Sequence, residues 1–243
     1  MMDRSIAART NIFAGSLDQH LFSSAPGSRP GQPLGWELRY SIVQGVASAL
    51  HYLHDQRVVH RDLKASNIML DAAFTARLGD FGLARTIETD KTSYMEEAGG
   101  GVHGTVGYIT PECYHTEKAT RESDVYAFGA VLLEVVCGRR PRCDIDGFHF
   151  LVDWVRRLHR DGRALEAVDP SLDEDDAERL LMLSLACSHP TPAERPKAQA
   201  ISQILLRSMP RPAVPPFKPS FVWRRTEGST PCPQRRDRRR ARS

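Results

Sequence analysis

The chain has 243 residues, which is room for one domain of ordinary size. Hydrophobic residues make up 41% and charged residues 26%, which is normal for a soluble globular protein and excludes a fully disordered chain. Residues 211–243 contain ten Lys or Arg against two acidic residues, so this tail has a net charge of +8. Because the net charge of the whole chain is +3, the remainder carries −5. The basic character belongs to the tail, and we expect no nucleic-acid-binding face on the folded part.

The sequence predicts neither a targeting segment nor a membrane segment. Asp3, Arg4 and Arg9 interrupt the start and no long apolar run follows, so we expect no signal peptide. The most apolar stretch, 127–137, is too short to span a bilayer and contains Glu134. The five cysteines are odd in number and show no metal-ligand spacing, which favours reduced thiols in a cytosolic compartment over a disulfide framework or a zinc site.

The first strong periodicity begins at Leu34. Residues 1–33 show little pattern, and 23–33, rich in Ser, Pro and Gly, predict a loop. After Leu34, apolar residues recur every three or four positions, which predicts an amphipathic helix that buries one stripe. The stripe consists of Leu38, Ile42, Val46, Leu50 and Leu53.

Short strands are predicted after this helix. Residues 58–63 form a strand-like run that leads into a polar loop. Residues 67–70 and 76–78 read as two strands joined by a turn at Asp71. Residues 83–110 form a long irregular stretch, and long loops in compact domains are usually functional or mobile.

Helices dominate the rest of the chain. Ser123 or Asp124 is positioned to cap a strongly apolar helix that runs to about Cys137, with Gly138 as its stop. Further helices are predicted over 150–159, over 177–187 and after Pro196, which suits a first helical turn. The predicted fold class is therefore mainly α (α+β), with a few short strands.

One segment carries recognisable chemistry. Residues 60–67 read His-Arg-Asp-Leu-Lys-Ala-Ser-Asn, and Asp80-Phe81-Gly82 follows thirteen residues after Asn67. Phosphoryl transfer requires a carboxylate that accepts the proton of the attacking hydroxyl, oxygen ligands for magnesium, and a cation near the moving phosphoryl group. The two motifs in this order and spacing are the signature of a protein kinase.

The remainder of the chain supports this interpretation. Residues 104–112, Gly-Thr-Val-Gly-Tyr-Ile-Thr-Pro-Glu, resemble the end of a kinase activation segment, and 124–129 resemble the start of the large buried helix. Residues 15–22, 151–155 and 221–223 resemble plant L-type lectin-domain receptor kinases in particular. Over about residues 11–223 the chain is similar to a plant receptor-like serine/threonine protein kinase.

The resemblance implies a protein-kinase-like fold, present as its C-terminal lobe with short β-hairpins at the catalytic and magnesium loops. It implies ATP and Mg²⁺ as cofactors. Asp62 is expected to be the catalytic base and Lys64 to contact the γ-phosphate. Asn67 and Asp80 are expected to bind magnesium, and Met69 to lie beneath the adenine ring.

Regulation and specificity follow from the same resemblance. Arg61 marks the type of kinase whose activation loop is held by phosphorylation, with Arg61 as one cationic partner. Thr92, Ser93 and Thr105 lie in the activation segment and are candidate phosphorylation sites, although solvated loop hydroxyls are the alternative reading. Lys64 and Thr105 favour serine/threonine over tyrosine specificity.

Three further residues have an expected structural role. Glu112 and Arg195 are expected to form a buried ion pair, and Asp124 to hold the backbone of the His-Arg-Asp segment. Thr110 stands where the family usually has Ala. Residues 96–102 look like an insertion with three glycines, which would loosen the activation loop.

The match lacks the N-terminal lobe. Nothing in residues 1–57 reads G-x-G-x-x-G or V-A-I-K, so the Gly-rich loop, the ATP lysine and the helix glutamate are missing. We expect a non-family start at 1–10, a partial kinase domain at 11–208 and a Pro/Arg-rich disordered tail at 209–243. The Arg run of the tail could alternatively bind acidic lipid or nucleic acid.

Two functions follow from the sequence. The first is a serine/threonine protein kinase in receptor-like signalling, present as a partial catalytic domain, that acts on protein serine or threonine. The second is a catalytically inactive truncated kinase that acts as a binding or competitor module, for example against a full-length receptor kinase. The expected location is cytoplasmic, at the inner face of the plasma membrane if the chain is part of a receptor.

Overall fold

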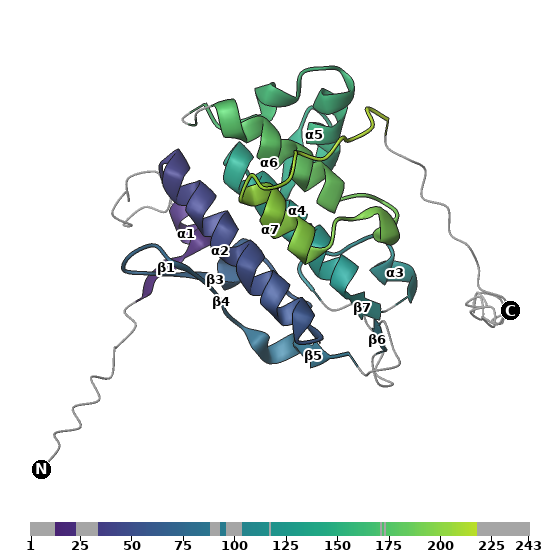
Figure 1. Ribbon diagram of the computed structural model, residues 1–243. Coiled ribbons are helices and arrows are strands. Elements are labelled where there is room, and N and C mark those ends of the chain that lie inside the picture. Colours follow the sequence, from purple (N-terminus) through teal and green to yellow (C-terminus); the bar gives the residue numbers. More distant parts are fainter. Residues whose placement is uncertain are drawn as a thin grey trace, which may run out of the picture.

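The computed structural model describes residues 13–22, 34–87, 93–95, 104–116, 118–170, 172 and 174–217. Figure 1 shows a bundle of helices with short sheets along one side and one end. The helices are α1 (Leu17–Leu21), α2 (Trp36–Asp55), α3 (Cys113–Thr116), α4 (Arg121–Cys137), α5 (Leu151–Arg160), α6 (Glu174–Cys187) and α7 (Ala198–Leu205). The prediction of a mainly helical fold with a few short strands is confirmed.

The strands are short and pair only in antiparallel fashion. They are β1 (Phe13–Ser16), β2 (Val58–Val59), β3 (Ile68–Asp71), β4 (Ala76–Leu78), β5 (Arg85–Thr86), β6 (Ser93–Met95), β7 (Lys118–Thr120), β8 (Arg142–Ile145) and β9 (Phe148–Phe150). β1, β3 and β4 form one sheet, and β2–β5, β6–β7 and β8–β9 are separate pairs. Single helical turns lie at Ala65–Asn67, Phe81–Leu83, Ala164–Ala167 and Pro192–Glu194.

Helix α2 packs along α7 and across β4. The predicted helix is confirmed, but Leu38 of its predicted stripe is 39% exposed. The buried face instead centres on Ile42, Val46 and Leu50, each at most 1% exposed. Burial of an aliphatic side chain of this size contributes roughly 1.5–3 kcal/mol relative to exposure, so this face fixes α2 against the core.

Helix α4 is the central element and is buried over most of its length. Ser123 or Asp124 was the predicted N-cap, and this prediction is wrong: Thr120 caps α4, and its Oγ1 accepts a hydrogen bond from the Ser123 amide. Ser123 returns the contact by accepting from the Thr120 amide, which forms a capping box. The prediction of Gly138 as the stop is confirmed, since its φ of 61° is the left-handed conformation that glycine adopts without strain.

Helices α4 and α6 approach so closely that only glycine fits between them. A Cβ atom on Gly129 would lie 2.8 Å from the Cβ of Cys187 and 2.9 Å from the Oγ of Ser188. Both distances are shorter than real carbon contacts allow, so the absence of a side chain at Gly129 sets the spacing of the two helices.

The hairpin predicted over 67–70 and 76–78 is confirmed as β3–β4, in which Met69 pairs with Arg77. The strand predicted over 58–63 is largely wrong, because only Val58–Val59 pairs, with Arg85–Thr86. The residues that follow Val59 leave the sheet and form the loop described below. Strand β1, helix α1 and the β8–β9 hairpin are additional elements that the sequence pattern did not predict.

The C-terminal helices are α5, α6 and α7, as predicted, with one correction. Pro196 lies two residues before α7 rather than in its first turn, and Lys197 is the N-cap residue. In the part of the chain that the structure describes, no helix is long and apolar enough to cross a membrane.

Candidate active site

The loop between β2 and β3 brings a carboxylate and an ammonium group together with a hydroxyl of the 104–112 segment. The Oδ2 atom of Asp62 accepts a hydrogen bond of 2.6 Å from Lys64 Nζ, and its Oδ1 atom accepts one of 3.0 Å from Thr105 Oγ1. Lys64 Nζ also donates to Thr105 Oγ1 at 3.1 Å, which closes a three-residue ring. The Asp62 and Lys64 side chains are 10% and 21% exposed, so the ring is open to solvent at one edge.

Asn67 orients the same carboxylate. Its Nδ2 atom donates to the Asp62 carbonyl oxygen at 2.8 Å and to Asp62 Oδ2 at 3.3 Å. Both contacts use the side-chain nitrogen of Asn67, so its side-chain oxygen, Oδ1, points away from Asp62. A carbonyl oxygen of this kind is a potential metal ligand.

Asp80 lies next to Asn67 because the Gly79 amide donates to the Asn67 carbonyl oxygen at 2.8 Å. Asp80 is exposed and adopts the left-handed conformation, with φ 56° and ψ 68°, which Asp tolerates better than most residues. Its Oδ1 atom caps the following turn by accepting from the Gly82 amide at 3.4 Å. The carboxylate of Asp80 and the Oδ1 of Asn67 are hard oxygen donors of the kind that magnesium prefers, and this metal usually completes its shell with water and phosphate oxygens.

Asp124 at the start of α4 holds the backbone of the loop. Its Oδ2 accepts from the His60 amide at 2.8 Å and its Oδ1 from the Arg61 amide at 2.9 Å. The ring of His54, at the end of α2, contacts the same Oδ2 atom at 3.0 Å. Arg61 has a φ of 74°, and a conformation that costs about 1–3 kcal/mol persists only where surrounding contacts hold it in place.

A second buried ion pair holds the end of the 104–112 segment. Glu112 accepts from Arg195 through both carboxylate oxygens, at 2.6 and 2.9 Å, and the Arg195 side chain is fully buried. Arg195 also donates to the carbonyl oxygens of Glu122 and His189, each at 2.9 Å. Thr110 is buried, with its Oγ1 atom 3.5 Å from Arg195 Nη2, so its hydroxyl has a polar neighbour.

One hydrogen-bonded pair with a buried carboxyl was missed at the level of sequence. The Tyr108 hydroxyl donates to Glu134 Oε2 at 2.6 Å, and Glu134 is 1% exposed. Burial raises the pKa of Glu134 to about 8, and burial also raises the pKa of Tyr108. A glutamate within the apolar run 127–137 was the available signal, since a carboxyl among apolar residues needs a partner.

Two more of the predicted residues, Met69 and Arg61, are described by the structure. Met69 is half-buried on β3, and Arg61 Nη1 donates to the Leu83 carbonyl oxygen at 3.3 Å. Thr92 and the predicted insertion over 96–102 lie outside the described residues. Ser93 is the first residue of β6, which pairs with β7. The structure describes the backbone of Ser93 and not its side chain.

Residues 10–205 match the family model described as protein tyrosine and serine/threonine kinase. The chain belongs to this kinase family. The resemblance that the two motifs indicated is thereby confirmed.

Curated relatives narrow the similarity to plant receptor kinases. The L-type lectin-domain containing receptor kinase VIII.1 of Arabidopsis thaliana is 44% identical over 224 residues, which cover 86% of this chain and 30% of the relative. The L-type lectin-domain containing receptor kinase SIT2 of Oryza sativa subsp. japonica is 44% identical over 216 residues, which cover 85% of this chain and 31% of the relative. The chain spans about a third of the length of the curated relatives that it matches.

Proposed function

We propose that this kinase-family chain carries the catalytic loop of a serine/threonine protein kinase that transfers the γ-phosphoryl group of ATP to protein hydroxyls. The observation that supports the proposal is the ring formed by Asp62, Lys64 and Thr105, with Asn67 and Asp80 beside it. These residues supply the carboxylate, the cation and the oxygen ligands that phosphoryl transfer requires.

Each residue has a proposed role in the transfer. Asp62 orients the substrate hydroxyl and accepts its proton, because its carboxylate is held by three neighbours and remains 10% exposed. Lys64 neutralises charge on the transferred phosphoryl group. Asn67 and Asp80 would hold Mg²⁺, which would supply positive charge that neutralises the phosphates of ATP. Met69 contacts the adenine ring from below.

The Lys64–Thr105 hydrogen bond supports serine/threonine rather than tyrosine specificity. It ties the phosphate-contacting lysine to the segment that ends in Glu112, so the substrate-facing loop and the catalytic loop form one unit. An alkyl hydroxyl on a short side chain must reach Asp62 closely, and a compact site of this kind accommodates it.

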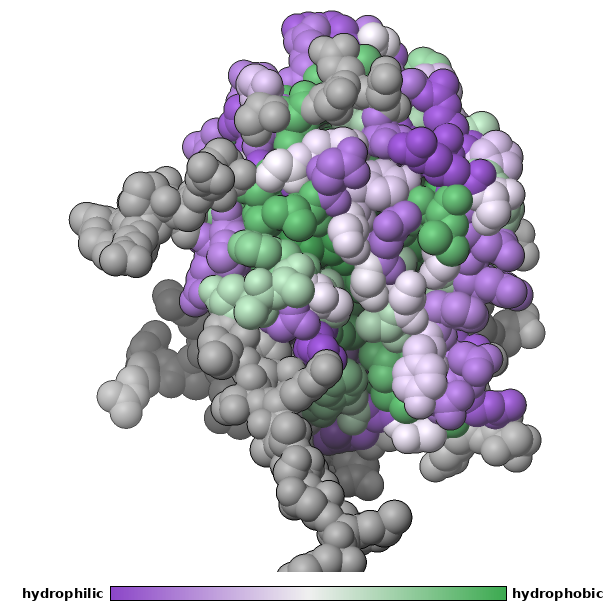
Figure 2. All heavy atoms as spheres, turned by 60° about the vertical axis from the view of Figure 1, so that its left-hand side comes forward, coloured by the Kyte–Doolittle hydropathy of each residue, from purple (hydrophilic) through white to green (hydrophobic). Residues whose placement is uncertain are grey.

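We further propose that residues 11–208 form the C-terminal lobe of the kinase domain, with a non-family start at 1–10 and a Pro/Arg-rich tail at 209–243. Figure 2 views the face that carries α1, α2 and β1, where apolar side chains lie between hydrophilic ones. Phe81, beside the proposed magnesium ligand, is 48% exposed, and its ring packs at a tilt against the His60 ring with a centroid distance of 5.1 Å. An exposed aromatic ring at the catalytic loop suits a covering N-terminal lobe.

Regulation is proposed through the activation segment. Phosphorylation of Thr92 or Ser93 would add a dianion that Arg61 can bind. Acting beneath the plasma membrane on serine or threonine of a protein substrate fits the receptor kinases to which the chain is similar.

A second candidate is a non-catalytic module that binds partners in competition with a full-length receptor kinase. It is favoured by the exposed ring of Phe81, which offers a partner an apolar contact beside the catalytic loop. The set of Asp62, Lys64, Asn67 and Asp80 favours the first candidate, because a scaffold has no chemical need for it.

Thermal unfolding of the 243-residue chain separates the two candidates. ATP with Mg²⁺ should raise the melting temperature, ATP with EDTA should not, and Asp80→Asn should remove the rise, because that substitution takes away a metal ligand. Asp80 is exposed, so the variant should fold; Arg142→Gln, an exposed site on β8, is the matched control. A folded parent chain that shows no magnesium-dependent shift would favour the binding module.

A further inference from the structure

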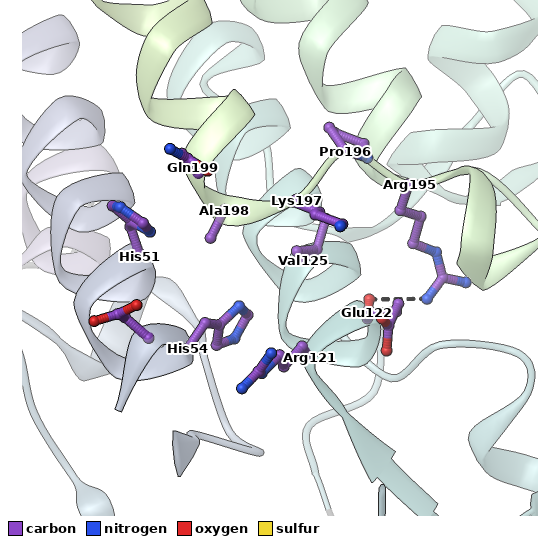
Figure 3. Close-up of a pocket in the computed structure, with 11 residues that line it drawn as sticks. His51, His54, Arg121, Glu122, Val125, Arg195, Pro196, Lys197, Ala198 and Gln199 are labelled. Carbon is purple, nitrogen blue, oxygen red and sulfur yellow. Dashed lines mark hydrogen bonds between the residues drawn. The ribbon is translucent and has the colours of Figure 1, made fainter. Parts of the chain in front are cut away.

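A pocket lies behind the catalytic loop, between the end of α2 and the starts of α4 and α7. Its volume is about 220 Å³. Figure 3 shows the side chains of His51, His54 and Arg121 around the space between these three helices, with Lys197 and Ala198 at the start of α7. None of the proposed catalytic residues lines it.

Hydrogen-bond donors without acceptors gather in this pocket. The Nε atom of Arg121 is buried and meets no acceptor in the described part of the chain. No side chain caps α7, and the amides of Ala198 and Gln199 meet no acceptor among the described residues. Buried or uncapped donors cost free energy when left unpaired, so an acceptor that enters the pocket would relieve several groups at once.

The local charge favours an anion. Helices α4 and α7 both begin at the pocket, and the N-terminus of a helix carries a partial positive charge. Arg121 and Lys197 add two full positive charges and have no ion-pair partner among the described residues.

The acidic residues of the pocket must be weighed against these donors. Asp55 and Glu122 also line it. Glu122 lies in the first turn of α4, where the positive helix end offsets its charge, and Asp55 is exposed to solvent, which screens it. Among the described residues neither carboxylate accepts a hydrogen bond from Arg121 Nε or from the first amides of α7, so these donors are available to a ligand.

We propose that the pocket between α2, α4 and α7 binds a phosphate group, either as inorganic phosphate or as a phosphomonoester. A phosphate accepts several hydrogen bonds at once, from Arg121, Lys197 and the first amides of α7. The proposal is independent of the proposed kinase activity, because it uses none of the catalytic residues.

The position of the pocket would couple phosphate to the active site. His54 lines the pocket and contacts Asp124, which holds the amides of His60 and Arg61. Arg195 also lines it and holds Glu112. A phosphate in this pocket would therefore lie beside both anchors of the catalytic segments, and its binding should change the amide environments of His60 and Arg61.

The test is a phosphate titration of the full 243-residue chain at constant ionic strength, with chloride as the balancing anion. We expect inorganic phosphate to shift the backbone NMR signals of Ala198 and Gln199. At tenfold excess over the dissociation constant, the melting temperature should rise by about 3–6 °C. Arg121→Gln and Lys197→Gln should each weaken binding by about tenfold or more, and Arg142→Gln should leave it unchanged.

A second titration, with O-phosphoserine, distinguishes a site for phosphomonoesters from a site for inorganic phosphate. Binding at least as tight as that of inorganic phosphate assigns the site to phosphomonoesters, and weaker binding assigns it to the free anion. The proposal is overturned if Ala198 and Gln199 do not respond, or if chloride alone gives the same rise. It is also overturned if Lys64→Ala abolishes the response while Arg121→Gln keeps it, because the anion would then occupy the catalytic loop.

Discussion

The Arg195→Met substitution tests how much the buried ion pair of Glu112 and Arg195 contributes to the free energy of unfolding. Arg195 is fully buried and makes two short hydrogen bonds to Glu112 and one each to the carbonyl oxygens of Glu122 and His189. Methionine fills similar space but leaves the Glu112 carboxylate, only 10% exposed, without its cation. Breaking one partner of a buried pair costs about 3–5 kcal/mol, so the free energy of unfolding should fall by that amount.

The assay is urea unfolding followed by far-UV circular dichroism, together with thermal unfolding. For a domain of this size the expected loss lowers the melting temperature by about 6–20 °C. A double-mutant cycle with Glu112→Gln should show that the two substitutions are not additive, because each already breaks the same pair.

The matched control is Arg163→Met. Arg163 makes two hydrogen bonds of 2.6 Å to Glu166, but the two side chains are 58% and 52% exposed. An exposed pair of this kind contributes about 0–1 kcal/mol. If Arg195→Met costs no more than Arg163→Met, the reasoning from burial is refuted.

Three further predictions concern other contacts of the fold. Asp124→Asn should lower the free energy of unfolding by about 1–3 kcal/mol and speed hydrogen exchange at the His60 and Arg61 amides; unchanged exchange at both would contradict the anchoring role. Because the folded pKa of Glu134 is raised to about 8, above its ordinary value of 4.5, stability should fall as pH rises from about 4.5 to 8, by at most about 1.4 kcal/mol per unit. In melting temperatures recorded across this pH range, Glu134→Gln should remove the fall of stability with pH. If the melting temperatures of the parent chain and the variant change with pH in parallel, the prediction is wrong. Gly129→Ala should destabilise by about 1–3 kcal/mol in urea unfolding, since the clash with Cys187 outweighs the better helix propensity of alanine; a more stable variant would show that α4 and α6 separate freely.

Local pattern was enough to predict the larger elements. The apolar spacing along α2, α5 and α6 and the hairpin β3–β4 depend on periodicity within one segment, which the sequence displays directly. Helix α1, with five residues, is too short to show a helical period, and it forms because Leu17 is buried in the core.

Contacts between distant segments could not be predicted from pattern. Asp124 is a good capping residue, but the amides of His60 and Arg61 engage its carboxylate, so Thr120 caps α4 instead. The pair of Tyr108 and Glu134 likewise joins an irregular loop to a helix. Tertiary hydrogen bonds of this kind override local preference.

The candidate site shows the same division. The motifs named Asp62, Lys64, Asn67 and Asp80 because their order is characteristic. The pocket between α2, α4 and α7 has no such motif, since its residues come from three segments whose approach only the fold determines.

The central claim is that Asp62 belongs to a working phosphoryl-transfer site. The most direct measurement is transfer of labelled γ-phosphate from ATP by the native polypeptide, captured from its source at whatever length it has, beside the same polypeptide with Asp62→Asn. The account predicts magnesium-dependent labelling of serine or threonine that Asp62→Asn lowers by at least about 100-fold. Labelling that survives Asp62→Asn, or a native protein that folds and binds partners but transfers no phosphate, would contradict it.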